Sequence, residues 1–244
     1  MKIGIIGAGS IGTTLARRFS AGGHDVAVAN SRGPETIGAE ALEFGAHAVT
    51  SADTVKDKDV IVLSIPFARI PAVAPLFASV PDQTVVIDTS NYFPHRDGAI
   101  EAVDNGQVES LWVTEQLGRP VVKAWNAVLS QTLELMDAPA GTPDRIALPV
   151  AADTEEARRV GMRLVDESGF DPFDAGTLAD SWRQQPMMPA YCTELDLRDL
   201  EKALNAADRD AAPRVRDRML ERVLEFTSTP TREQLLELNR SAHR

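Results

Sequence analysis

The sequence predicts an α/β fold in which a doubly wound parallel sheet is followed by a helical C-terminal appendage. Strand and helix patterns alternate as far as about residue 175, which is typical of βαβ units joined by right-handed crossovers. A glycine-rich turn joins the first strand to the first helix, and from Thr193 onward the apolar spacing is helical only. We therefore expect two parts, residues 1–175 and residues 176–244.

The first βαβ unit carries a dinucleotide-binding motif. The buried strand 2–6 is followed by a G-x-G-x-x-G turn formed by Gly7, Ala8, Gly9, Ser10, Ile11 and Gly12. Gly7 permits the tight turn, Gly9 lets a pyrophosphate approach the backbone, and Gly12 lets the helix pack closely on the sheet. Free N–H groups at the helix start favour phosphate. This context predicts a Rossmann-type domain; the alternative is a glycine-rich turn in an ordinary α/β protein.

The residues after the second strand, 25–29, indicate which dinucleotide binds. NAD enzymes usually carry an acidic residue here for the ribose 2′-hydroxyl, whereas this chain has Asn30, Ser31 and Arg32. A guanidinium can bind a 2′-phosphate with two charge-assisted hydrogen bonds, and a serine hydroxyl can add a donor. The sequence therefore favours NADP as the cofactor. A solvated arginine on a strand-end loop is the alternative.

The remaining elements follow the same alternation. Further strands are expected at 46–49, 59–63, 84–87, 120–124, 145–150 and 170–173, and helices at 35–44, within 66–79 and at 154–168.

Three amphipathic helices are expected in the appendage. They are marked by Leu197, Leu200 and Leu204, by an apolar stripe within 215–226, and by the segment 231–239. The first two stripes predict a homodimer surface. Packing of these helices on the sheet of the same chain is an equally open alternative.

Composition and charge exclude several classes of function. The chain has 244 residues and a net charge of −11, which opposes nucleic-acid partners and anionic membrane surfaces. A single cysteine, Cys192, excludes an intramolecular disulfide and a cysteine metal cluster, and the four histidines lack metal-ligand spacing. The apolar stretch 60–80 is interrupted by Arg69 and three prolines, so it does not predict a membrane span. With no secretory signal, we expect a cytoplasmic protein.

Polar residues at the carboxyl ends of later strands are candidates for the rest of the site. Ser64, Ile65 and Pro66 follow the fourth strand and are expected beside the nicotinamide ribose; a plain turn is the alternative. Asn91 and His95 follow the fifth strand and are candidate substrate contacts, whereas the alternative is a capping and turn segment.

The segment after the sixth strand and a later loop supply the other candidates. Asn126 and Ala127 are expected near the nicotinamide, with Asn126 bonding the ring amide or the substrate. Trp125 is expected to line the pocket and Trp182 to cover a flat substrate. The alternatives are a helix cap for Asn126, core packing for Trp125, and packing between sheet and appendage for the loop around Trp182.

Several common catalytic arrangements are missing from the sequence. Tyr92 and Tyr191 are followed four positions later by Arg96 and Leu195, so there is no Tyr-x-x-x-Lys pair. There is also no G-x-S-x-G elbow and no Walker A loop. Hydride transfer between a nicotinamide and a flavin-like ring needs none of these, because aligning two flat rings supplies much of the rate. No catalytic side chain and no metal ligand are predicted.

Taken together, the motifs are similar to those of the NADPH-dependent reductases of deazaflavin coenzyme F-420. The nucleotide-binding domain of STEAP-type ferric reductases is also similar. The matching segments cover roughly residues 1–175 and are GIIGAGSIG at 4–12, NSR at 30–32, SIPF at 64–67, DTSNYFPHRDG at 88–98 and VVKAWNA at 121–127.

The resemblance implies a role for each matching segment. It implies a 2′-phosphate contact at Ser31 and Arg32, a pyrophosphate loop at 7–12, a ribose contact at 64–67, and a nicotinamide contact at Asn126. Ala8 and Thr36 depart from the threonine and lysine of those reductases, so NADP preference rests on the serine and arginine. The appendage is also longer than those reductases need.

The resulting expectation is an NADP(H)-dependent oxidoreductase that transfers a hydride between the nicotinamide and a flavin-like or deazaflavin acceptor. Two alternatives remain at this point. One is an NADP(H)-binding regulator or sensor without catalysis, which the missing acid–base residue fits equally well. The other is a reductase of an imine or carbonyl compound.

Overall fold

The computed structural model describes residues 1–223, 225–226 and 228–243, without the side chains of residues 213, 217 and 220. Its first half contains β1 (Lys2–Ile6), α1 (Ser10–Ala21), β2 (Asp25–Ala29), β3 (His47–Ala48), α2 (Ser51–Thr54), β4 (Val60–Leu63), α3 (Ile70–Val73), β5 (Val85–Asp88), α4 (Pro94–Asp97), α5 (Glu101–Asp104) and α6 (Glu109–Leu117). Its second half contains β6 (Val122–Lys123), α7 (Ser130–Leu135), β7 (Ala147–Val150), α8 (Glu155–Glu167), β8 (Asp171–Asp174), α9 (Leu197–Asn205), α10 (Ala212–Val223) and α11 (Arg232–Ser241).

Six parallel strands form the main sheet in the order β3-β2-β1-β4-β5-β6. This is the Rossmann order, and the predicted fold class is confirmed. The strand order reverses between β1 and β4, where Ile5 pairs with Val28 on one side and Val62 on the other. Because the strands are parallel, all their carboxyl ends lie at one edge of the sheet.

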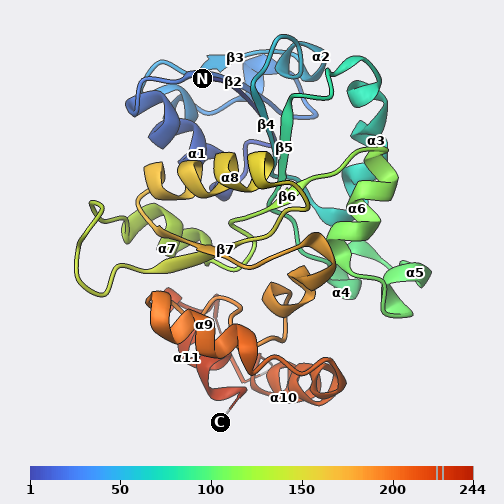
Figure 1. The fold of residues 1–244 in the computed structure, drawn as a ribbon, viewed down its shortest axis with the longest axis vertical. Coiled ribbons are helices and arrows are strands. Elements are labelled where there is room, and N and C mark those ends of the chain that lie inside the picture. The colour runs from blue at the N-terminus through green and yellow to red at the C-terminus, as the bar shows by residue number, and fades with distance from the viewer. Residues whose placement is uncertain (224, 227, 244) are drawn as a thin grey trace.

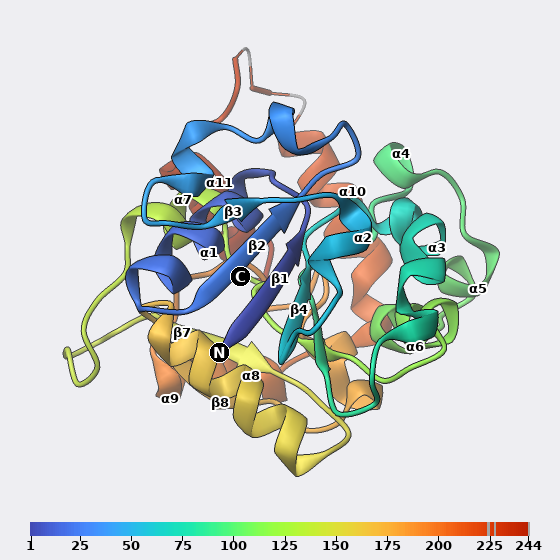
Figure 2. The ribbon, with the colours of Figure 1, turned by 90° about the horizontal axis from the view of Figure 1, so that it is seen from above.

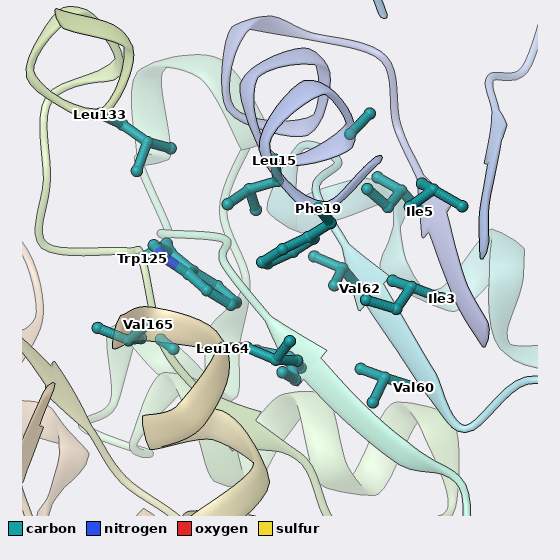
Figure 3. Packing of buried hydrophobic residues seen from close by; sticks show 14 of the residues in the cluster. Ile3, Ile5, Leu15, Phe19, Val60, Val62, Trp125, Leu133, Leu164 and Val165 are labelled. Atoms are coloured by element: carbon teal, nitrogen blue, oxygen red, sulfur yellow. The ribbon is translucent and has the colours of Figure 1, made fainter. Parts of the chain in front are cut away.

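Helices cover both faces of the sheet, which explains the continuous apolar runs in its strands (Figures 1 and 2). One face packs against α1, α7 and α8, and the other against α3 and α6. On the first face, the Trp125 ring meets Phe19 edge-on at 5.9 Å between ring centroids, with Leu164 and Val165 close by (Figure 3). Its Nε1–H donates to Ser168 Oγ at 3.1 Å, so the polar end of this buried ring is satisfied.

The last two expected strands form in the predicted places but do not extend the parallel sheet. β7 and β8 pair with each other as a separate two-stranded parallel sheet. A single antiparallel bridge between Lys123 and Ala151 joins them to the main sheet. The chain between β6 and β7 therefore reverses direction instead of making a crossover.

The helix expected at 35–44 is wrong, because this segment contains two short 3-10 turns. They span Pro34–Thr36 and Ala39–Leu42. Gly38 between them is extended, with φ −63° and ψ 142°, and so breaks the helical path.

The appendage contains helices at the predicted positions. Leu200 and Leu204 of α9 are buried against β7 and β8, whereas Leu197 is 42% exposed. This stripe therefore packs largely within its own chain, and the homodimer stays a prediction. None of the described helices has both the length and the hydropathy needed to cross a membrane.

The Trp125 packing predicts a large stability effect. Trp125→Ala is expected to lower the free energy of unfolding by about 3–5 kcal/mol, because it leaves a cavity in the core. Urea unfolding at equilibrium measures this change. Trp182→Ala removes the same side chain from a half-buried site and serves as the control. An equal or larger loss in the control would contradict the core assignment.

Candidate functional site

Gly7 lies where three strands of the sheet end. Its φ of +111° suits glycine, and its N–H donates to Ala29 O at 2.8 Å. A Cβ on Gly7 would lie 2.0 Å from Ser64 O. The turn after β1 is therefore in direct backbone contact with the segments that follow β2 and β4, and no larger residue fits there.

The other two glycines of the motif have different surroundings. A Cβ on Gly12 would lie 1.9 Å from Gly7 O. The backbone of α1 therefore lies directly against the backbone of the turn and leaves no room for a side chain at Gly12. A Cβ on Gly9 would meet nothing within 4 Å, and Gly9 makes no side-chain cap for α1. The first turn of α1 thus presents uncapped N–H groups beside open space, which is the arrangement a pyrophosphate needs.

The turn after β2 is held in shape by Asn30. Asn30 Oδ1 accepts from the backbone N–H of Arg32 at 2.9 Å, and Asn30 Nδ2 donates to Thr36 Oγ1 at 2.8 Å. Ser31 and Arg32 are exposed, and within the described part of the chain the Arg32 guanidinium has no hydrogen-bond or ion-pair partner. The position that the sequence assigns to a 2′-phosphate therefore carries an available cation.

The segment after β4 is anchored by its neighbours on both sides. Ser64 N–H donates to Ile6 O at 2.8 Å, and the buried Phe67 ring stacks on Trp112 at 4.6 Å between centroids. Ser64 and Ile65 are half-buried and Pro66 is exposed. These three residues lie at the carboxyl edge, beside the glycine turn.

A fully buried ion pair joins the ends of β5 and β6. Lys123 Nζ lies 2.7 Å from Asp88 Oδ2, and both side chains have no exposed surface. Lys123 Nζ also donates to Ser90 O, while Asp88 Oδ1 accepts from Ser90 N and Ser90 Oγ at 3.0 and 2.7 Å. The pair thus fixes the start of the segment that follows β5.

Glu109 is a second buried carboxyl group close to this pair. It is the first residue of α6, and its Oε2 accepts from the N–H of Tyr92 at 3.2 Å. Burial raises the pKa of Glu109 to about 7, with Lys123 opposing the rise and Asp88 and Asp97 adding to it.

Four polar side chains link the main sheet to the segment between β8 and α9, residues 175–196, which we call the loop before α9. Asn91 Nδ2 donates to Asn126 O at 2.8 Å, and Asn126 Nδ2 donates to Asn91 Oδ1 and Gln184 O at 3.0 and 2.8 Å. Gln184 Nε2 donates to Asn126 Oδ1 at 2.8 Å, and Asn91 Nδ2 also approaches Tyr191 Oη at 3.5 Å. The side-chain amide of Asn126 is therefore fully engaged by the protein itself.

The sequence-predicted substrate residues are only partly brought together. Asn91 is bonded directly to Asn126, but His95 is exposed on α4 and its ring faces Phe93. Trp182 lies under the guanidinium of Arg209, 5.3 Å from the ring centroid. Trp125 does not line a pocket: its ring is 1% exposed in the core, which corrects that expectation and follows its alternative.

Five polar residues of this edge were not predicted as site residues: Asp88, Glu109, Lys123 and Gln184, which are buried, and Tyr191, which is half-buried. Asp88 and Lys123 lie within the segments 88–98 and 121–127, which resemble the reductase motifs, and this could have identified them as site residues. Glu109 had none, because its burial depends on how α6 packs after a loop of irregular structure.

Comparison with known proteins decides the family. Residues 2–92 match the family described as NADP oxidoreductase, coenzyme F420-dependent. The Escherichia coli K12 protein YjhV is 35% identical over 103 residues, which is 42% of this chain and 75% of YjhV. The hypothetical protein SMa0349 of Sinorhizobium meliloti is 33% identical, with a TM-score of 0.69 over 80% of this chain and 95% of that one.

The chain belongs to the coenzyme F420-dependent NADP oxidoreductase family. It is therefore an NADP-dependent oxidoreductase, as the sequence predicted. A protein of Arthrobacter sp. FB24, provisionally named an F420-dependent NADP-reductase, shares the fold at 19% identity and a TM-score of 0.58, covering 74% of this chain and 87% of that one. The residues that match the family include the glycine turn and Arg32, whereas Lys123, Asn126 and Gln184 lie beyond the match.

The contact at Gly7 predicts that this family member depends on its glycine turn. Gly7→Ala adds both a strained φ and a clash with Ser64 O, so we expect unfolding free energy to fall by about 3 kcal/mol or more. Gly23→Ala is the matched control, since Gly23 also has a positive φ but open space around it, and should lose about 1–2 kcal/mol. Chemical denaturation measures the free energy of unfolding of both variants and of the wild-type protein. Equal losses would show that the contact with Ser64 is unimportant.

Proposed function

We propose that this oxidoreductase transfers a hydride between NADP(H) and a flavin-like or deazaflavin acceptor at the carboxyl edge of its main sheet. The observation that carries the proposal is that three features suited to a dinucleotide lie together at this edge. An open glycine turn, an available arginine and a bonded pair of asparagines follow strands of one parallel sheet. Ligands of open α/β sheets bind at this edge, next to the point where the strand order reverses.

The residues present fit the cofactor. Residues 7–12 would hold the pyrophosphate through the uncapped N–H groups of α1, because Gly9 leaves the approach open. Ser31 and Arg32 would bind the 2′-phosphate, and Ser64, Ile65 and Pro66 would lie along the ribose. When bound, NADPH supplies the hydride.

The nicotinamide end of the site would be formed by the segments after β5 and β6. Asn126 and Ala127 are almost fully buried, and the amide of Asn126 is bonded to Asn91 and Gln184. We therefore assign Asn126 a positioning role: it holds Asn91 and the backbone of its own segment in place for the ring.

The loop before α9 would complete the acceptor side. Gln184 and Tyr191 belong to this loop, and both contact the asparagine pair at the end of the main sheet. In this proposal residues 1–175 bind the cofactor and residues 176–244 help to cover the acceptor. Such a cover excludes water and aligns two flat rings, which is most of what hydride transfer requires.

The proposed 2′-phosphate contact is tested by Arg32→Ala. Loss of a charge-assisted hydrogen-bonding partner should weaken NADPH binding about 10- to 100-fold, while NADH binding stays within about twofold. Calorimetric titration of both nucleotides measures this difference. Arg159→Ala removes an exposed arginine from α8 and should leave both affinities unchanged. Unchanged NADPH affinity in Arg32→Ala would remove the basis for the assignment.

The acceptor class is tested by following the absorbance of reduced nicotinamide with a panel of acceptors. We expect saturable oxidation of NADPH with coenzyme F420, FMN or FAD, because the site is built to align two flat rings. Imines, carbonyl compounds, quinones and ferric chelates complete the panel. Tight NADPH binding without turnover on any of them would favour a nucleotide sensor. Turnover confined to imines or carbonyl compounds would contradict a flavin-like or deazaflavin acceptor and favour a reductase of those compounds.

A further inference from the structure

The buried carboxyl group of Glu109 has no role in the function proposed above. Glu109 is only 5% exposed. Among the described residues, its carboxyl group accepts one hydrogen bond, from the N–H of Tyr92 at 3.2 Å. The charged and titratable groups that interact with it come from five parts of the fold: Lys123 of β6, Asp88 of β5, Asp97 of α4, Tyr92 of the segment between β5 and α4, and Tyr191 of the loop before α9.

The charges in this cluster do not balance when Glu109 is ionised. Lys123 is paired with Asp88 at 2.7 Å, and Arg96 is paired with Asp97 at the same distance. Each pair is neutral, so an ionised Glu109 adds an uncompensated negative charge to a buried region. A buried charge of this kind is costly unless a positive charge lies close to it.

The position of Glu109 suggests where that positive charge comes from. Tyr92, which donates to Glu109, directly follows Asn91, and Asn91 bonds the backbone of Asn126 at 2.8 Å. The carboxyl group therefore contacts the backbone of the segment that carries Asn91, which is one of the two strand-end segments that we assign to the nicotinamide. A nicotinamide ring is neutral when reduced and cationic when oxidised.

We propose that Glu109 is the electrostatic partner of the nicotinamide, protonated when the ring is reduced and ionised when the ring is oxidised. This inference rests on the proposed function, because it requires the nicotinamide at this edge. Glu109 acts through the field of its charge and touches neither ring, so it is a positioning residue.

Charge and protons balance in this scheme. Oxidation of the bound nicotinamide moves one hydride, with both electrons, to the acceptor and leaves the ring with one positive charge. Glu109 then releases its proton to solvent, and its negative charge offsets that of the ring. The acceptor takes up one proton from solvent to complete its two-electron reduction.

The pKa of Glu109 determines how the binding of NADP+, relative to that of NADPH, changes with pH. In the protein without nucleotide, burial raises this pKa to about 7, and a cationic ring nearby lowers it. NADP+ therefore binds best to the ionised form, which predominates above pH 7. As the pH rises through 7, the ratio of the dissociation constant of NADP+ to that of NADPH should fall.

The test measures both dissociation constants between about pH 6 and pH 8.5, a range that spans the raised pKa. The wild-type ratio should fall about three- to tenfold, as expected when the ring lowers this pKa by about one unit. Titration of the 2′-phosphate cancels in the ratio, since both nucleotides carry it. In Glu109→Gln the ratio should become independent of pH. Glu115→Gln changes an exposed carboxylate of the same helix and should keep the wild-type dependence.

Other outcomes overturn specific parts of the inference. A wild-type ratio that does not change with pH, or a pH dependence that persists in Glu109→Gln, would contradict the role of Glu109 while leaving NADP(H) binding intact. Failure to bind either nucleotide would instead contradict the proposed function. Because Glu109→Gln alters a buried site, carbon NMR of the Glu109 carboxyl in the wild-type protein provides a second measurement. Its pKa should be lower in the NADP+ complex than in the NADPH complex, and equal values would refute the coupling.

Discussion

The buried ion pair between Lys123 and Asp88 is the interaction on which the carboxyl edge depends. Breaking a buried pair by removing one partner typically costs about 3–5 kcal/mol, because the remaining charge is left without compensation. Here the pair also bonds Ser90, so it connects β5, β6 and the start of the segment that carries Asn91. Asn91 in turn bonds Asn126, and through Gln184 the loop before α9 is joined to the same edge. The edge and the loop before α9 are thus joined in one polar network that begins at this ion pair.

The sequence predicted the parts of this molecule that depend on local chemistry. The glycine turn and the apolar strands each follow from neighbouring residues, and the doubly wound parallel sheet followed from the alternation of strands and helices. The helix expected at 35–44 failed because Gly38 interrupts it, and the last two strands left the main sheet because the chain reverses after β6. Trp125 was misplaced for a different reason: a strand-end position does not fix the side of the backbone to which a ring turns. Glu109 and Gln184 could not be found because their burial depends on packing between segments far apart in the chain.

The two ends of the proposed site differ in how they are built. The phosphate end consists of backbone N–H groups and one exposed arginine, so it is open to solvent. The ring end is enclosed, with its amides bonded to one another and a buried carboxyl group behind them. The family match covers the first end and stops at residue 92. In the proposed function, most of the acceptor side is formed by residues beyond this match.

Hydrogen–deuterium exchange with and without saturating NADPH tests whether the cofactor binds along the carboxyl edge, because it reports on every proposed segment at once. If NADPH binds along the carboxyl edge, exchange should slow at 7–12, 30–36, 64–67, 88–93 and 122–127, which lie at the ends of five different strands, and should not change in α11. Protection confined to the appendage, or no protection at the carboxyl edge while NADPH is bound, would contradict it.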